Sequence, residues 1–542
     1  MKHPRVIFSF AFLFGLLLAL SAHAKNVHTG FKSFVKGGDD NAAKGRYSTV
    51  VSGFGNVASN DFSSVLCGTN NVADGIAATV GGGGNNTASG DFATVGGGEQ
   101  NQATTNSTTV GGGQGNVASG FGAAVGGGAN NTASGDLGTA AGGAGNIASN
   151  QYAMVGGGQD NVAGDVAATV SGGANNIASG FVATIGGGAN NGASGSFASI
   201  GGGQQNQATT NSATVGGGFT NTAGGDHATV GGGKINLASG TGAIVGGGEN
   251  NIASSTGATV GGGQANTASD GHTTVGGGLA NTATNDASTV SGGDFNIASG
   301  VTATVGGGNN NTASGALATV GGGEGNSAGG DFATVSGGGF NNASGDHAIA
   351  PGGANCQATG TASFAAGRRA QAVNEGAFVW ADNNNFAISS TTSNEFTARA
   401  TGGVRFVSAI NNTGTPTAGV TLAAGGGAWA SLSDVNAKAN FADVDARALL
   451  MKLANIPVKT WNYKSQAESI RHIGPTAQDF KAAFGVGEDE TRITTVDADG
   501  VALAAIQGLY QMLQERDTSI IELRQQIRTL QEQMQKLQLS SH

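Results

Sequence analysis

A β-branched residue recurs at a fixed interval along more than half of the chain. Val or Ile stands at every fifteenth position from 50 to 335, with Ala140 as the one exception, and Ala350 ends the series. Asn follows six residues after each of these positions as far as Asn341, and Ala follows eight residues after every one. The twenty-one units contain no insertion. Such strict self-similarity is typical of a protein built from stacked repeats.

The pattern inside each unit predicts strands, because a helix would need apolar residues every three to four positions. A unit such as 78–92 contains Ala-Thr-Val, a run of glycines, an Asn-x-Ala stretch and a polar turn. Alternation places Ala and Val on one face of the strand and Thr on the other. Each unit is therefore predicted to form one coil of a parallel β-solenoid that buries ladders of Val, Ala and Asn. Twenty-one coils at one strand spacing each would extend about 100 Å.

The pattern changes after residue 359. Residues 367–383 are predicted to form a last, irregular coil plugged by Phe378 and Trp380, and residues 394–409 a pair of strands. The segment 444–456 has helical spacing and ends before Pro457.

From Val501 the spacing becomes that of a coiled coil. Its two core positions are occupied by Ile506, Leu513, Ile520, Ile527 and Met534, and by Leu509, Arg516, Leu523, Leu530 and Leu537. Ile at one core position and Leu at the other would by itself favour a parallel dimer. Arg516 interrupts one core layer and is a candidate for setting the register.

The N-terminus has the pattern of an export signal. A short basic start is followed by an apolar run that is too short for a convincing membrane span, and then by the small-x-small sequence Ala22-His23-Ala24. We therefore expect residues 1–24 to be removed and the protein to be exported, without a transmembrane anchor. An uncleaved anchor is the less favoured alternative.

Composition and charge narrow the function further. Glycine supplies 101 of 542 residues and charged residues only 11%, so an ordinary core with a charged surface is not expected. The net charge is −10 and basic runs are absent, which argues against nucleic acid as a partner. Residues 47–350 hold fifteen Asp and Glu but one Lys, which predicts an acidic, solvated surface. An ion-binding role is less favoured.

Candidate binding sites within the repeats are weak. His227, His272 and His347 share one phase but lie three and five coils apart, too far for a common metal. Cys67 and Cys356 are about nineteen coils apart and cannot bridge within one chain. Each is expected to be a small buried thiol, although each could meet its own copy in an oligomer. No cofactor or metal is expected.

An outward row of threonines is also predicted, because Thr precedes the Val position in 15 of 21 units. Such a row could bind a glycan or ice. The simpler interpretation is structural, since Thr suits any exposed strand position.

The repeats resemble the head of trimeric autotransporter adhesins. In that family a repeated strand of the form Ser-Val-Ala-Ile-Gly stacks into a left-handed parallel β-roll, and three chains pack together. Here Ala-Thr-Val-Gly-Gly, as at 78–82, takes its place over about residues 45–380. The resemblance implies a mainly β, homotrimeric, adhesin-like fibre with a possible surface or glycan ligand. The glycine triplets, the strict period and a helical end in place of the family's β-barrel anchor are departures.

The C-terminal segment resembles the intramolecular chaperone domain of phage tailspikes and endosialidases, peptidase family S74. The resemblance rests on Ser433-Asp434 with Lys438, then TWNY (460–463), RHIGPTAQDF (471–480) and DADGVALAAIQGL (497–509). It implies an α+β domain, trimeric through its coiled coil, that helps an upstream β-stalk to assemble and then cuts itself off just before the serine.

The resemblance completes the expected division of the chain. We expect a signal peptide (1–24), an N-terminal segment (25–45), the solenoid (46–366), a β connector (367–430), a chaperone-like core (431–500) and a coiled coil (501–542).

Elementary chemistry is consistent with self-cleavage. A serine hydroxyl needs a base, and a lysine can serve when burial keeps it neutral. Ser433 and Lys438 are thus the candidate catalytic pair, with the Leu432–Ser433 peptide bond as substrate. Family members usually carry an Arg between the Ser-Asp pair and the Lys, whereas here residues 435–437 are Val-Asn-Ala.

Two functions remain open at this stage. The favoured one is an exported trimeric fibre with a self-cleaving chaperone. The alternative is a structural or binding fibre whose C-terminal domain is a non-cleaving clasp. A glycan-degrading tailspike is disfavoured by the signal peptide and by the lack of paired carboxylates at one level of the rod.

Overall fold

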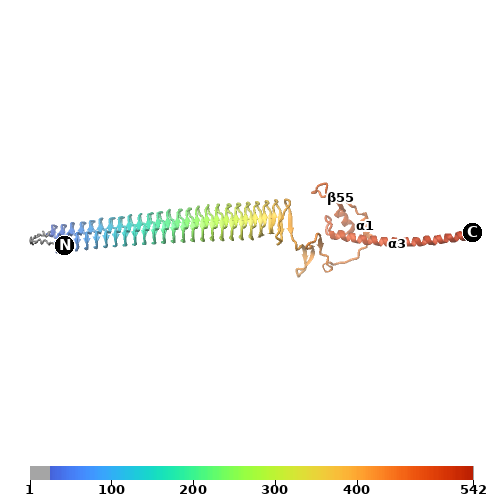
Figure 1. The fold of residues 1–542 in the computed structure, drawn as a ribbon, viewed down its shortest axis with the longest axis horizontal. Coiled ribbons are helices and arrows are strands. Elements are labelled where there is room, and N and C mark those ends of the chain that lie inside the picture. Colours follow the sequence, from blue (N-terminus) through green and yellow to red (C-terminus); the bar gives the residue numbers. More distant parts are fainter. Residues whose placement is uncertain (1–24, 541–542) are drawn as a thin grey trace, which may run out of the picture. The chain divides into compact units, whose positions relative to one another are not determined.

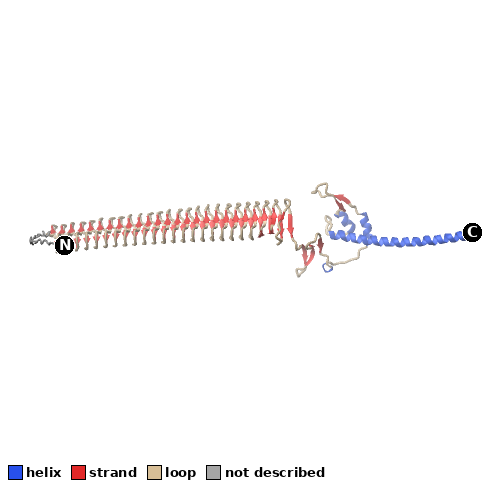
Figure 2. Ribbon diagram, viewed as in Figure 1, coloured by secondary structure: helices blue, strands red, loops and turns tan. Residues whose placement is uncertain are grey.

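A computed structural model describes residues 25–540, which divide into two compact units, one ending at Arg399 and the other beginning at Ala400. The predicted signal peptide lies outside the described residues. Figures 1 and 2 show the first unit as a regular stack of short strands and the second as helices with small sheets.

The first unit is a parallel β-solenoid, as predicted. From β3 (Ala42–Ala43) to β44 (Ile349–Ala350) every coil contributes two strands of two residues, one at Thr-Val and one at the x-Ala of Asn-x-Ala. β8 (Thr79–Val80) pairs in parallel with β10 (Thr94–Val95), fifteen residues on. The Asn-x-Ala strands, together with the strands that continue them at both ends, form a 25-stranded sheet. A third ladder of single bridges, such as Gly84 with Glu99, runs along the remaining side.

The stack extends past the predicted boundaries of 46 and 366. β1 (Val27–His28) and β2 (Phe34–Val35) pair with β3 and β4 (Thr49–Val50) in the same register, because Val35 and Asn41 already keep the repeat phase. At the other end three strands lengthen to four or five residues. The strands there are β45 (Gly353–Ala354), β46 (Gln357–Ala358), β47 (Phe364–Arg368), β48 (Ala370–Ala372), β49 (Phe378–Ala381), β50 (Ile388–Ser389) and β51 (Phe396–Arg399).

Buried asparagines tie successive coils together. The backbone N–H of Asn86 donates to Oδ1 of Asn71 at 3.0 Å. The side-chain amide of Asn86 donates to the carbonyls of Gly82 at 2.9 Å and Gly98 at 2.8 Å. The same pattern recurs along the stack, so these fully buried amides satisfy their hydrogen-bonding groups without water. The predicted Val, Ala and Asn ladders are confirmed by the burial of these side chains.

The third glycine of each triplet is required by the spacing between coils. Gly98 has φ +90°, and a Cβ there would lie 2.0 Å from the carbonyl oxygen of Gly113 and 2.8 Å from Nδ2 of Asn101. At the neighbouring Gly97 a Cβ would meet only the Gly82 carbonyl oxygen, at 3.8 Å. Only the third position therefore combines a left-handed backbone with a close approach to the next coil.

We expect Gly98→Ala to destabilise the solenoid by about 3 kcal/mol, from backbone strain and overlap with the next coil. Gly97→Ala should leave the free energy of unfolding nearly unchanged. Denaturant unfolding followed by circular dichroism compares the two variants. Equal losses of stability would show that the left-handed corner does not limit the packing of coils.

The prediction that Phe378 and Trp380 plug the end of the solenoid is wrong, because the residue that follows each of them faces the core instead. Val379 and Ala381 are buried, whereas Trp380 is 40% exposed. The Phe378 ring lies outside, between the rings of Phe364 at 4.4 Å and Phe396 at 5.0 Å. The repeat shortens by one residue before Val379, which keeps a small apolar side chain inside and sends the aromatic rings outwards.

The expectation of two buried thiols holds for one cysteine only. Cys356 takes the Asn position of its coil, and its N–H donates to Oδ1 of Asn341 at 2.9 Å. Its side chain is buried, and burial raises the pKa of the thiol. Cys67 is exposed. It stands two residues after Val65, at a position outside the core that is glycine in most other coils.

The second unit starts with a small antiparallel sheet and continues into helices. β52 (Val404–Ile410), β53 (Pro416–Leu422) and β54 (Trp429–Ser431) form the sheet. After the 3₁₀ turn η1 (Val435–Ala437) come α1 (Ala446–Asn455), the antiparallel pair β55 (Lys459–Trp461) and β56 (His472–Gly474), α2 (Ala477–Phe484) and α3 (Thr495–Ser540). The predicted helix before Pro457 is α1.

A modest core joins the three helices. Ile456, Phe480 and Val501 are buried together. α1 lies close against α3 because Gly508 has no side chain: a Cβ there would be 2.2 Å from the carbonyl oxygen of Ala446. Beyond this contact α3 continues as a long helix whose heptad positions are open to solvent, with Leu513 48% and Ile527 52% exposed in the single chain.

Among residues 25–540, no helix combines the length and the apolar character that crossing a membrane requires.

Candidate functional site

Ser433 and Lys438 lie together at the start of the helical part. Nζ of Lys438 donates to Oγ of Ser433 at 2.6 Å. The short turn η1 between them reverses the chain, and Asp434 caps it by accepting the Asn436 N–H at 2.8 Å and its side-chain amide at 3.0 Å. The Val-Asn-Ala sequence at residues 435–437 therefore does not keep the lysine from the serine.

Asp434 is a site residue to which the sequence reasoning gave no role. An aspartate directly before a short turn accepts the N–H two residues on and fixes the turn. That local pattern was legible in the sequence as Asp-Val-Asn, but the return of Lys438 to Ser433 depends on the turn's geometry.

Both members of the pair are exposed in the single chain. A lysine acts as a base only when it is neutral, and burial disfavours the charged form. The arrangement can thus pass a proton from serine to lysine once the two side chains are covered.

The Leu432–Ser433 bond follows directly after β54. The Leu432 N–H donates to the Gly419 carbonyl oxygen of β53 at 2.9 Å. Leu432 and Ser433 also line a cavity of about 220 Å³ together with residues of β52 and β53, among them Arg405 and Phe406. The predicted bond is therefore anchored on its N-terminal side.

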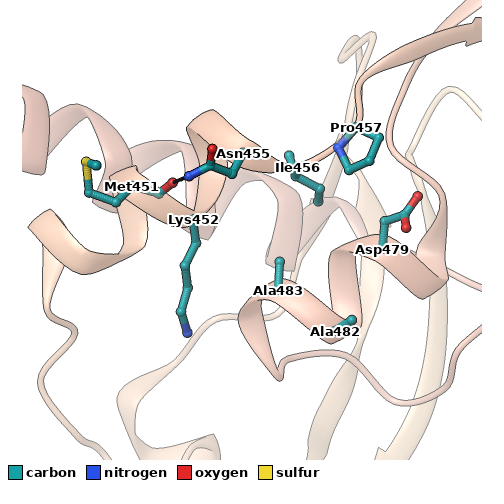
Figure 3. A pocket seen from close by; sticks show the side chains of 8 residues that line it. All are labelled: Met451, Lys452, Asn455, Ile456, Pro457, Asp479, Ala482 and Ala483. Atoms are coloured by element: carbon teal, nitrogen blue, oxygen red, sulfur yellow. Dashed lines mark hydrogen bonds between the residues drawn. The ribbon is translucent and has the colours of Figure 1, made fainter.

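A second cavity, of about 480 Å³, lies between the end of α1 and α2 (Figure 3). Its lining residues are Met451, Lys452, Asn455, Ile456, Pro457, Asp479, Ala482 and Ala483. The Asn455 side chain donates to the Met451 carbonyl at 2.8 Å, which closes the last turn of α1. The lining contains no serine, cysteine or histidine, and its two charged side chains are Lys452 and Asp479.

The motif at 460–463 together with 471–474 builds local structure. The Trp461 ring lies 4.9 Å from that of His472 and 5.0 Å from that of Tyr463, measured between ring centres. Nε2 of His472 lies 2.9 Å from Oε1 of Gln466, and Arg471 donates to the Thr460 carbonyl at 2.9 Å. These contacts hold β55 and β56 together, so the motif residues have structural partners.

The pKa of the Asp489 carboxyl is lowered in this structure. Hydrogen bonds from the Thr491 side chain and N–H, with the Arg492 guanidinium, hold its pKa well below the usual range. These contacts come from residues two and three positions on, which is the mark of a structural loop contact and not of a catalytic acid.

His227, His272 and His347 are exposed on separate coils. Across the part of the chain that the structure describes, no three or more His, Cys, Asp or Glu side chains are grouped to hold a metal ion.

Comparison with known proteins concerns the second unit. No curated protein matches the chain. The adhesin resemblance of the repeats stays a prediction. One match to a family model begins at Ser433 and takes in α1, β55, β56 and all of α2. Residues 433–486 match the model of the family described as Chaperone of endosialidase (Peptidase_S74), so an endosialidase-chaperone type of domain follows the long β-solenoid.

Proposed function

We propose that this chain is an exported, adhesin-like homotrimeric fibre whose C-terminal domain drives assembly and then cuts itself off before Ser433. The contact between Lys438 Nζ and Ser433 Oγ carries the proposal, since it occurs at the first residue of the matched domain. A cut there would leave the solenoid and the sheet β52–β54 on one product and every helix found within residues 25–540 on the other.

The position of Ser433 determines the chemistry. Its hydroxyl belongs to the residue that supplies the nitrogen of the scissile bond. Attack of Oγ on the Leu432 carbonyl carbon closes a small ring made of the backbone and side-chain atoms of Ser433. Neutral Lys438 takes the hydroxyl proton and returns it to the nitrogen as the C–N bond breaks. The product is an ester between Leu432 and Ser433 Oγ, and water hydrolyses it to the Leu432 carboxylate and free serine.

Assembly offers a way to time this reaction. The exposed heptad positions of α3 fit a coiled coil with further copies of the chain. Partner copies that cover Ser433 and Lys438 would exclude water and favour the neutral lysine. Cleavage would then follow assembly, so a single chain would not shed its chaperone early.

Exposure of the pair also supports the alternative function. If partner copies leave Lys438 in water, it stays an ammonium and the domain persists as a coiled-coil clasp on a structural or binding fibre. The two functions differ in one observable, the fate of the Leu432–Ser433 bond after assembly.

Substitution of Lys438 tests the proposed function. In the assembled wild-type chain we expect a C-terminal fragment that begins at Ser433, seen by intact mass. Lys438→Met should slow its appearance by roughly 10²- to 10⁴-fold, the usual contribution of a general base. Lys464→Met, an exposed lysine in the same domain, is the matched control and should cleave normally. Assembled wild type that stays whole would favour the clasp.

A further inference from the structure

The segment that leads to the scissile bond is itself a strand of a sheet. β54 pairs antiparallel with β53 through Val420 opposite Ser431, Thr421 opposite Ala430 and Leu422 opposite Trp429. The hydrogen bond from Leu432 N–H to the Gly419 carbonyl continues this ladder one residue past β54. The ladder thus reaches the residue whose carbonyl carbon Ser433 would attack.

We propose that β52 and β53 are the substrate-binding element of the self-cleavage reaction, with β54 as the docked substrate strand and Gly419 as the residue that positions Leu432. This inference rests on the proposed function. Strand addition to a sheet edge is a general way to bind an extended peptide, with main-chain hydrogen bonds supplying most of the hold. The bond to be cut is then selected by strand register.

Gly419 is the one residue of this contact that a side chain would disrupt. It has φ +151°, and a Cβ would lie 2.3 Å from the Phe406 carbonyl oxygen and 3.1 Å from Cα of Val407. The register between β52 and β53 shifts at this level, between Val407 and Ala409. The bulge and the glycine together let β53 pass close to β52 while its carbonyl faces Leu432.

Side chains give the docked strand further support. The Trp429 ring lies 5.5 Å from that of Phe406, which joins β54 to β52 across the sheet. Leu432, 42% exposed, lines the cavity of about 220 Å³ that Arg405 also lines. The carboxylate that cleavage creates at Leu432 would therefore form at the edge of a cavity that the basic residue Arg405 also lines.

Hydrogen exchange tests the docking without any cleavage. In the full chain carrying Ser433→Ala, we expect the Leu432 amide to exchange slowly. Adding Gly419→Val should remove that protection. Adding Gly427→Ala should not, because Gly427 lies in the loop before β54 and a Cβ there would meet nothing within 4 Å. A Leu432 amide that exchanges as fast as the free loop overturns the docking.

Cleavage kinetics test the positioning. With Ser433 intact, Gly419→Val should slow fragment release roughly 10- to 100-fold, as expected for a misplaced reacting group. The shape of the rate against pH should not change, because the proton acceptor is untouched. Leu432→Pro, which removes the donor and leaves β52 and β53 unaltered, should be slow as well. Gly427→Ala should cleave at the wild-type rate.

The outcomes separate the two claims. Normal cleavage by assembled Gly419→Val and Leu432→Pro chains overturns the positioning role and leaves the Ser-Lys proposal standing. An assembled wild type that never cleaves overturns the proposed function, and this inference falls with it. Slow variants whose assembly and helix content match the wild type support the inference.

Discussion

Replacing Ser433 with alanine should leave the assembled chain at full length, with cleavage at Leu432–Ser433 reduced to background. The expected loss is at least about 10³-fold, because alanine removes the nucleophile and leaves Lys438 without its partner. Intact mass spectrometry of the assembled protein measures the result. The substitution removes one exposed hydroxyl at the end of a turn capped by Asp434, so the fold should be unaffected.

Two controls distinguish a role of Ser433 as the nucleophile from its mere position next to the cleaved bond. Ser465→Ala changes another exposed serine of the same domain and should cleave normally. Hydroxylamine added to the wild type during cleavage should capture the ester and leave a hydroxamate on Leu432. A Ser433→Ala chain that still releases a fragment beginning at residue 433 would refute the ester route.

The solenoid was predictable because stacking imposes the same demand on every coil. An inserted residue would shift every ladder, so the period, the Asn position and the Ala position stay visible in the sequence. The predictions from sequence were wrong at positions where stacking no longer requires a fixed spacing or residue type. At the end of the stack one residue is lost before Val379, and Phe378 and Trp380 move outside. Cys67 stands where most coils have a glycine. Because glycine has no side chain, the other coils do not reveal that a side chain at this position is exposed to solvent.

The candidate site was predictable only through its family motif. Ser433 and Lys438 are five residues apart, a spacing that in an extended strand would separate their side chains widely. They meet because Asp434 fixes a tight turn between them. The role of Gly419 was beyond the sequence for a similar reason, since it depends on a register shift in β52, on the far side of β53 from the bond to be cut.

Burial differs sharply between the two units, which bears on the proposed role of the helical domain in assembly of the solenoid. Each coil encloses little more than one Val, two Ala-sized residues and one Asn, on strands of two residues. A coil buries too little apolar surface to be stable alone, and pairing between coils must start somewhere before it can propagate. Slow pairing of this kind leaves strand edges open to aggregation. α3 instead folds locally, and its exposed Ile and Leu positions can bring copies together early.

Deleting residues 433–542 before folding should therefore prevent assembly of the solenoid, with most of the protein recovered as aggregate. Light scattering after size exclusion measures the assembled fraction, and circular dichroism measures the β content. The matched control is the uncleavable Ser433→Ala chain, which keeps α3 and should assemble fully. A second comparison removes the domain after assembly by cleavage at Leu432–Ser433, and that fibre should remain intact, since a stacked solenoid no longer needs a nucleus. Soluble trimers formed by the truncated chain alone would contradict the chaperone role.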